Sequence, residues 1–515
     1  MKHVTSAFAI ACMLAAMARP QSTQPAKTYR ISGVMLNGAT GQRLSRVNIV
    51  MTPAGGSKET ATTSGTDGRF AFESLPAGQW SLHAERKGFA RQAYGERPGA
   101  PNTSSYVVTG PDGASEDLSF RLDPPAVISG KITDEAGEPV AAALQVIIQL
   151  QTGRRQFMRI KDAATDEQGD YRIWDLPAVP CYLLVVTPTP PATASDQPPA
   201  TFAPQYYRNA TDPRAATMLD LKPGEEYKAD FVLRRVRGVS IHMTGEIGSS
   251  GIMLSAEGPG GAEVILAQLD PGQSGSFYNI APGHYKLTLY DMVRGTQSSK
   301  RIEVGAGDLT VEAPFPDPVT VTVKVRLVDG DGALPQNVTV LLHADGDYQT
   351  FARVLGPDGS ATIPGLTSGR YKFMLAVGGL YIQNITSENV RVVDGIVDVP
   401  ETGAVKLDVR VAAGGGQVIG KVRANGKPVP AALVVLAPRA DSTNSVDYHA
   451  YQTESDGSFH YTAIKPGDYV LFATTDRQLE YGNPAAIRKQ LAAGRPVRVE
   501  PKGLVDGLQI EPLRP

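Results

Sequence analysis

The sequence predicts an all-β protein made of about five antiparallel β-sandwich domains in tandem, arranged as beads on a string. The first observation is a repeat, because the stretch at residues 66–82 recurs about every 100 residues. The second is the alternation of apolar and polar residues inside each copy, which is the period of a β-strand. The third is the length of 515 residues, which exceeds what a single hydrophobic core supports. The other copies lie at residues 165–184, 270–287, 356–373 and 454–471.

Each copy predicts a strand, a bend and a second strand. Gly68 after Asp67 indicates a tight turn, because glycine adopts positive φ without steric cost. Phe70 then opens an alternating strand, Pro76 turns the chain, and Trp80 begins the next strand. An aromatic residue at this last position is expected to lie in a sandwich core. The equivalent residues in the other copies are Tyr182, Tyr285, Tyr371 and Tyr469.

The points at which the pattern restarts give the expected domain boundaries. The third domain is the shortest and the richest in glycine, and residues 187–204, rich in proline and threonine, are expected to form a long loop inside the second. The five sandwiches are predicted over residues 28–123, 124–235, 236–315, 316–411 and 412–515.

The beginning of the sequence resembles an export signal. Residues 1–18 have a basic start at Lys2, an apolar run and a small-residue end, and residues 19–27 are a polar tether. The mature protein is therefore expected to begin near Arg19 and to be exported, with a periplasmic, outer-surface or secreted location. No other stretch is long and apolar enough for a membrane helix, so no transmembrane segment is expected after signal removal.

One helix is expected within the last sandwich, at residues 483–494. Asn483 can cap the helix, and Gly494 can end it. Ile487 and Leu491 are four residues apart, so they would lie on one face.

Charge and cysteine content exclude two classes of protein. The net charge is −2, from 50 basic and 52 acidic residues without a long run of either sign, so a nucleic-acid partner is not expected. Cys181 is the only cysteine outside the predicted signal, which excludes an intrachain disulfide in the mature protein.

Two motifs resemble a known family. Residues 137–140 and 426–429 have the pattern G-x-P-V, and a strand of the form [ST]-D-G-x-[FY] and a P-G-x-Y turn follow. This combination resembles the carboxypeptidase regulatory-like domain, a transthyretin-like sandwich within the carbohydrate-binding-like folds, most closely in the first, second and fifth units. The resemblance implies a structural or interaction module and leaves carbohydrate binding as a possibility.

Local catalytic motifs are missing from the sequence. No histidine stands in an H-x-x-E or H-E-x-x-H string of a zinc site, and no G-x-S-x-G string is present. The Asp-Gly pairs at 329–332 and 345–347 are expected to be turns rather than calcium sites. Lys131 and Lys421 lie on the outward parity of their strands, so an isopeptide cross-link is not expected. The predicted function is that of a non-enzymatic, cofactor-free interaction protein of the cell envelope; the alternatives are a carbohydrate-binding module array and an accessory or unrecognised hydrolase.

Candidate binding residues are aromatic side chains near predicted loops, together with Trp174, which falls out of phase with Tyr171 and Ile173 in its strand and is expected to be exposed. A ring at a loop tip offers a flat apolar face, and a tyrosine adds a hydroxyl group, which suits a glycan or a peptide of an envelope protein. The alternative is that each ring covers the edge of its own sandwich. The candidates are Tyr94, Trp174, Tyr206, Tyr207 and Tyr481.

Overall fold

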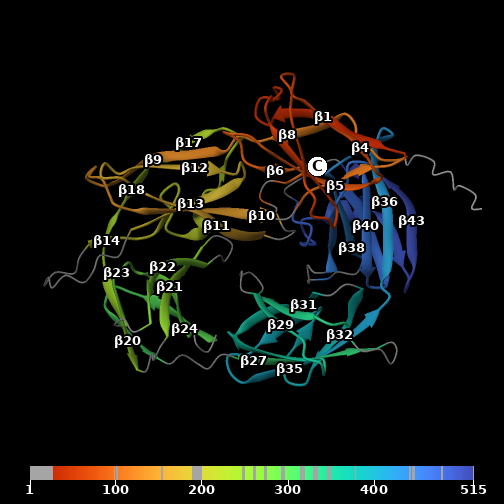
Figure 1. The fold of residues 1–515 in the computed structure, drawn as a ribbon. Helices are drawn as coiled ribbons and strands as arrows, with labels where there is room; N and C mark the ends of the chain where they lie inside the picture. Colours follow the sequence, from red (N-terminus) through yellow and green to blue (C-terminus); the bar gives the residue numbers. More distant parts are fainter. Residues whose placement is uncertain are drawn as a thin grey trace, which may run out of the picture.

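The computed structural model confirms a nearly all-β protein of tandem sandwiches (Figure 1). One α-helix and one short 3₁₀ helix, η1 (Pro213–Ala215), accompany the strands of the described part of the chain. The expected export signal and both Asp-Gly pairs considered for calcium lie outside the described residues. The structure describes residues 27–97, 99, 103–151, 155–187, 200–245, 250–258, 263–271, 275–291, 296–313, 319–328, 334–344, 350–376, 379–439, 442, 447–476 and 479–513.

The strands form five sandwiches, each around its own hydrophobic cluster. Sandwich 1 contains β1 (Tyr29–Asn37), β2 (Asn48–Pro53), β3 (Thr60–Thr63), β4 (Arg69–Leu75), β5 (Gly78–Glu85), β6 (Gln92–Ala93), β7 (Val107–Thr109) and β8 (Leu118–Leu122). Sandwich 2 contains β9 (Ala126–Asp134), β10 (Ala143–Gln151), β11 (Arg155–Ala164), β12 (Asp170–Leu176), β13 (Pro180–Val186), β14 (Ala200–Phe202), β15 (Gln205–Tyr206), β16 (Leu219–Asp220), β17 (Glu226–Lys228), β18 (Phe231–Leu233) and β19 (Arg235–Arg237).

The remaining strands continue the series. Sandwich 3 contains β20 (Val239–Gly245), β21 (Gly251–Glu257), β22 (Glu263–Leu269), β23 (Ser276–Ile280), β24 (Gly283–Asp291), β25 (Thr296–Val304) and β26 (Leu309–Ala313). Sandwich 4 contains β27 (Val319–Leu327), β28 (Thr339–Ala344), β29 (Thr350–Val354), β30 (Ser360–Leu366), β31 (Gly369–Ala376), β32 (Leu380–Ser387), β33 (Val392–Val393), β34 (Ile396–Val399) and β35 (Ala404–Ala413). Sandwich 5 contains β36 (Gly416–Ala424), β37 (Lys427–Pro428), β38 (Leu433–Pro438), β39 (His449–Gln452), β40 (Ser458–Ile464), β41 (Gly467–Thr474), α1 (Arg488–Ala493), β42 (Arg495–Val499), β43 (Leu504–Ile510) and β44 (Pro512–Leu513).

All five sandwiches share one pairing rule for their first strand. In sandwich 1, β1 pairs antiparallel with β4 and parallel with β8. The strands β9, β20, β27 and β36 follow the same rule with their own partners. The turn glycine before the antiparallel partner has positive φ where the motif is D-G or Q-G, as at Gly68 and Gly169. This repetition confirms that the sequence repeat encodes one fold unit.

The repeated aromatic position lies in the core in most copies. Tyr285, Tyr371 and Tyr469 are buried, and each hydroxyl group donates a hydrogen bond to the carbonyl oxygen four residues earlier, at 2.7, 2.9 and 2.7 Å. Trp80 is half-buried against the core of sandwich 1, and its Nε1 donates to Thr109 Oγ1 at 2.9 Å. The ring thus fills the core, while its polar atom bonds the turn or a neighbouring strand.

Tyr182 departs from the expected core position. The spacing between the two strands is the same as in the other copies, with five positions from Leu176 to Cys181 as from Leu75 to Trp80, so Cys181 occupies the aromatic position and Tyr182 is the next residue. Cys181 and Leu183 therefore enter the core of sandwich 2, whereas Tyr182 and Leu184 face away from it. The prediction of a core aromatic was wrong for this copy.

The helix in sandwich 5 is shorter than expected, because α1 spans only Arg488–Ala493. Asn483 does not cap it; its Oδ1 accepts a hydrogen bond from the Ala485 N–H at 3.1 Å, which favours a local turn over a helix. The expected stacking of Ile487 and Leu491 is confirmed, since the Leu491 N–H donates to the Ile487 carbonyl at 2.9 Å and both pack in one apolar cluster.

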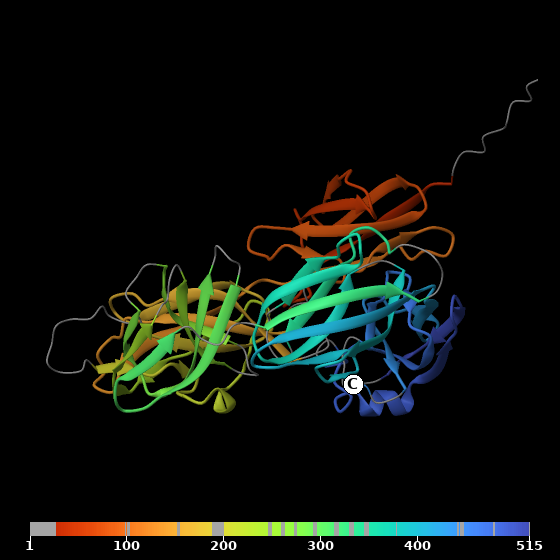
Figure 2. The ribbon, with the colours of Figure 1, turned by 90° about the horizontal axis from the view of Figure 1, so that it is seen from below.

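The sandwiches are not strung out as beads but follow one another around a closed ring, which Figures 1 and 2 show from two sides. Sandwich 5 returns to sandwich 1, where Ser105 Oγ donates to the Thr453 carbonyl at 2.7 Å. Sandwich 2 also contacts sandwich 5, through a bond of 3.3 Å from Gln149 Nε2 to Glu480 Oε1. The tandem sandwiches are thus confirmed, but their arrangement differs from the expected string.

Candidate functional site

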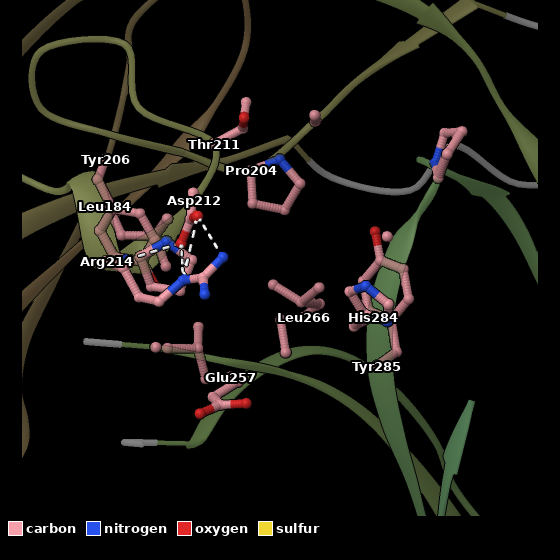
Figure 3. Close-up of a pocket in the computed structure, with 17 residues that line it drawn as sticks. Leu184, Pro204, Tyr206, Thr211, Asp212, Arg214, Glu257, Leu266, His284 and Tyr285 are labelled. Atoms are coloured by element: carbon pink, nitrogen blue, oxygen red, sulfur yellow. Dashed lines mark hydrogen bonds and ion pairs between the residues drawn. The ribbon is translucent and has the colours of Figure 1, made fainter. Parts of the chain in front are cut away.

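A cleft of about 1020 Å³ lies between sandwiches 2 and 3 (Figure 3). Its walls come from the outer face of β13, the segment from Ala203 to Arg214, the ends of β21, part of β22, and the beginning of β24. Clefts at domain boundaries with apolar linings and a few polar groups are common ligand sites. This cleft is therefore the candidate functional site.

The apolar part of the cleft continues the contact between the two sandwiches. Leu184 and Tyr206 of sandwich 2 pack with Val264 of sandwich 3 in one buried cluster, and Leu266 lies half-buried beside them. Leu184 reaches this face because its neighbour Leu183 enters the core of sandwich 2 and successive side chains of a strand point to opposite faces. Tyr182 lies on the same face of β13 and packs half-buried against this cluster, so both faces of the strand are covered.

Sandwich 2 contributes a cation to the rim of the cleft. Asp212 is the N-cap of η1, and its side chain accepts hydrogen bonds from the backbone N–H of Arg214 at 2.8 Å and from the Arg214 guanidinium at 2.8 to 3.2 Å. The side-chain hydrogen bond from Arg214 holds the pKa of Asp212 below its ordinary value. The Arg214 side chain is 90% exposed, so the cation at the rim is accessible to a ligand.

Sandwich 3 contributes groups of the other sign and an imidazole. Glu257 ends β21 at the rim, and its charge acts on Arg214, whose pKa is raised mainly by the hydrogen bond to Asp212. His284 is exposed at the start of β24 and points into the space that Figure 3 shows. Tyr285 is buried, and burial raises its pKa to about 12. The cleft can thus hold an apolar group on its floor with a charged group of either sign at its rim.

Only Tyr206 of the predicted binding residues reaches this cleft, and it lies there with its side chain 4% exposed. Burial raises its pKa above the ordinary value for tyrosine. Tyr207 next to it is half-buried on the core side, with ring centroids 5.9 Å from Tyr227 and 5.8 Å from Phe231. The adjacent pair therefore packs on both faces of sandwich 2.

The other three candidates do not line the cleft. Tyr94 is buried in sandwich 1, 5.6 Å from the Phe120 ring, and Tyr481 packs half-buried beside Ile487 in sandwich 5. Unlike these two tyrosines, Trp174 is exposed: 62% of its surface is accessible on β12, and Lys161 Nζ lies 4.5 Å from its ring centroid. The structure does not bring the five aromatic residues together.

Sequence reasoning missed the charged rim of the cleft. Asp212 followed by Pro213 and Arg214 is a recognisable helix start, so the sequence offered a local signal for this segment. Glu257 and His284 carried no such signal, because they meet the segment only through the packing of two sandwiches. Among the described residues, no group of three or more His, Cys, Asp or Glu side chains is placed to hold a metal ion.

Comparisons with known proteins agree with the fold unit. Residues 30–123 match the carboxypeptidase regulatory-like domain. None of the curated proteins matches the chain in sequence. In the described part of the chain, the one α-helix is too short to cross a membrane, and no longer apolar helix is present.

Several solved structures are similar in part. The Bacillus anthracis TIE protein has 10% identity and a TM-score of 0.18, over 76% of this chain and 75% of that chain. The minor pilin GBS52 of Streptococcus agalactiae has 11% identity and a TM-score of 0.21, over 41% and 97%. A variant of BcpA, the major pilin subunit of Bacillus cereus, has 8% identity and a TM-score of 0.15, over 74% and 99%. The family match is the informative one: over residues 30–123 this chain is similar to the carboxypeptidase regulatory-like domain.

Proposed function

We propose that the protein is an exported, non-enzymatic β-sandwich protein that acts as a structural and interaction module at the cell envelope. The observation that carries the interaction role is the cleft between sandwiches 2 and 3, with its shared apolar floor and its rim of Arg214, Glu257 and His284. The family match over residues 30–123 supports a module of this kind. The N-terminal sequence supports export.

The lining of the cleft favours an extended peptide segment over a glycan. Sugar rings are held largely by flat, accessible aromatic faces, but Tyr206 and Tyr285 are only 4% and 6% exposed. An apolar side chain of a peptide suits the floor at Leu184 and Leu266, while charged neighbours in the peptide suit Arg214 and Glu257.

A carbohydrate-binding role is the second candidate, and it rests on Trp174 alone. This indole is 62% exposed on β12, so a sugar ring has access to it. Lys161 already lies against the ring, which limits the free face.

Binding at the cleft is expected to depend on its rim charges. Peptides selected from a random display library on the full chain should lose about tenfold or more in affinity, which is about 1.4 kcal/mol, when Glu257→Lys is introduced. Glu401→Lys is the matched control, because Glu401 is also an exposed glutamate but lies in sandwich 4. Equal losses in both variants, or glycans on an array that bind only while Trp174 is intact, would contradict the peptide proposal.

Export is expected to remove the N-terminal segment. Expression of the full sequence in a bacterial host with an outer membrane should give a mature protein whose first residue is near Arg19, because the apolar run before it resembles a signal peptide. Intact mass measurement of the fractionated protein checks this. An unprocessed chain that stays in the cytoplasm would exclude the envelope location.

A further inference from the structure

Sandwiches 1 and 5 are joined by a polar contact that we call the clasp, formed by Gly95 and residues 105–108 of sandwich 1 and residues 452–456 of sandwich 5. Its hydrogen bonds link residues that lie 347 to 357 positions apart in the sequence. The clasp is the contact through which the last sandwich returns to the first. It has no part in the cleft between sandwiches 2 and 3.

The clasp completes the free edge of a strand. Val107 and Thr109 of β7 pair with β5, so the backbone groups of Tyr106 and Val108 face away from that sheet. The Val108 N–H donates to Ser455 Oγ at 2.9 Å, and the Tyr106 carbonyl accepts from the Ser455 N–H at 3.0 Å. Buried backbone groups need such partners, and here the last sandwich supplies them.

Side chains at the clasp are buried although they are polar. Ser105, Thr453 and Ser455 are 1%, 0% and 3% exposed. Gln452 Nε2 donates to the Gly95 carbonyl at 2.6 Å and to Ser105 Oγ at 3.1 Å. Opening the clasp would return these groups to water, where their hydrogen bonds can be replaced.

Glu454 lies at the centre of the clasp with 3% of its surface exposed. Its Oε2 accepts a hydrogen bond from the Tyr106 N–H across the boundary, and its Oε1 accepts from the Tyr451 hydroxyl at 2.6 Å. Burial raises the pKa of Glu454, the bonds from Tyr451 and Tyr106 oppose that rise, and the charge of Asp456 adds to it. When Glu454 is protonated, the Tyr451 hydroxyl can accept the new proton instead of donating, so the neutral form also fits the site.

A second carboxylate in the same turn behaves in the opposite way. Asp456 is 6% exposed, and burial alone would raise its pKa, but hydrogen bonds from Ser458 and Lys421 outweigh burial and lower it. Lys421 Nζ lies 2.9 Å from Asp456 Oδ2. The charged and titratable groups recorded around Glu454 are therefore Tyr451, Tyr106 and Asp456 with its partner Lys421, and none of them is a cation in direct contact with Glu454.

We propose that the clasp is a proton-controlled closure, in which protonation of Glu454 favours the closed ring and its ionisation favours release of sandwich 1 from sandwich 5. A carboxyl group with a raised pKa in the closed form stabilises closure fully below its ordinary value, and this stabilisation is lost as the pH rises through the raised value. Asp456 has the opposite dependence, because its contribution is lost only as the pH falls through its lowered value. The closed form is therefore most stable in mild acid.

The reactivity of a cysteine placed in the clasp tests this proposal. In Ser105→Cys the thiol is buried while the clasp is closed, whereas Ser104→Cys places a thiol on the neighbouring exposed residue and reports the ordinary pH dependence of thiolate formation. Cys181 gives little background, because it is fully buried and burial raises its pKa to about 12. The labelling rate of Ser105→Cys relative to Ser104→Cys should increase about tenfold or more between about pH 5 and about pH 8.

Adding Glu454→Gln to both cysteine variants should make this ratio independent of pH, because the amide keeps its hydrogen-bonding atoms but does not ionise. Glu401→Gln is the matched control and should leave the pH dependence intact. A constant ratio in the starting protein, or the same pH dependence with Glu454→Gln, would overturn the proposal. Small-angle X-ray scattering of the unsubstituted chain provides a second test: its radius of gyration should increase over the same pH range, and an unchanged radius would also overturn it.

Discussion

Replacement of Tyr206 by alanine is expected to lower the free energy of unfolding by about 3 to 5 kcal/mol, as for other large buried side chains. The ring is 4% exposed and packs with Leu184 and Val264, so its removal leaves a cavity between sandwiches 2 and 3. Urea unfolding of the full chain, monitored by circular dichroism, measures the effect on the unfolding transitions of the sandwiches. We expect the loss in the transitions of these two sandwiches.

Trp174→Ala is the control for this substitution. Its side chain is 62% exposed, so the loss of a ring there should change the stability by about 0.5 kcal/mol or less. If Tyr206→Ala were equally harmless while peptide binding fell, Tyr206 would be a recognition residue, as the sequence allowed, and the packing described for the cleft floor would be wrong.

Replacement of Gly130 by alanine is expected to destabilise sandwich 2 by about 3 kcal/mol or more. A Cβ atom at this position would lie 2.0 Å from the Ala229 carbonyl oxygen, and backbone cannot move away as a flexible side chain can. The same close approach occurs at Gly33, with the Leu118 carbonyl at 2.4 Å, and at Gly420, with the Leu508 carbonyl at 2.6 Å. Each is the point at which the first strand of a sandwich meets its parallel partner.

The control for Gly130→Ala is Gly305→Ala, because no atom lies within 4 Å of the Cβ position at Gly305. Thermal unfolding should show a lowered transition temperature for the first variant and an unchanged one for the second. An unchanged transition in Gly130→Ala would mean that β9 and its parallel partners are farther apart than described.

The sequence predicted the features that repeat locally. Alternation placed Phe70 and Ile173 in cores, and the P-G-x-Y turn placed Tyr285 there, because a strand's period and a turn's geometry depend only on neighbouring residues. One recurrent feature could not be predicted from the sequence: in every copy, the next-to-last residue of the strand after the glycine turn has positive φ. The residue type at this position varies, and only one of the five is glycine: Ser74, Asp175, Asn279, Gly365 and Ala463.

The cleft and the clasp could not be predicted in the same way. The cleft depends on which sandwich covers the outward face of β13 at Leu184. The clasp depends on the match between Ser455 and the open edge at Val108, 347 residues away. Neither contact leaves a periodic pattern in the chain, since each partner taken alone resembles an ordinary strand or turn.

The separation between the two halves of the clasp also affects how the protein is made. Val108 leaves the ribosome 347 residues before its partner Ser455, which at about 5 to 20 residues per second takes roughly 17 to 70 s. Throughout that interval the backbone of Tyr106 and Val108 has no partner from its own chain, and an unpaired strand edge can pair with another nascent chain. A chain interrupted before Gln452 would keep this edge open permanently.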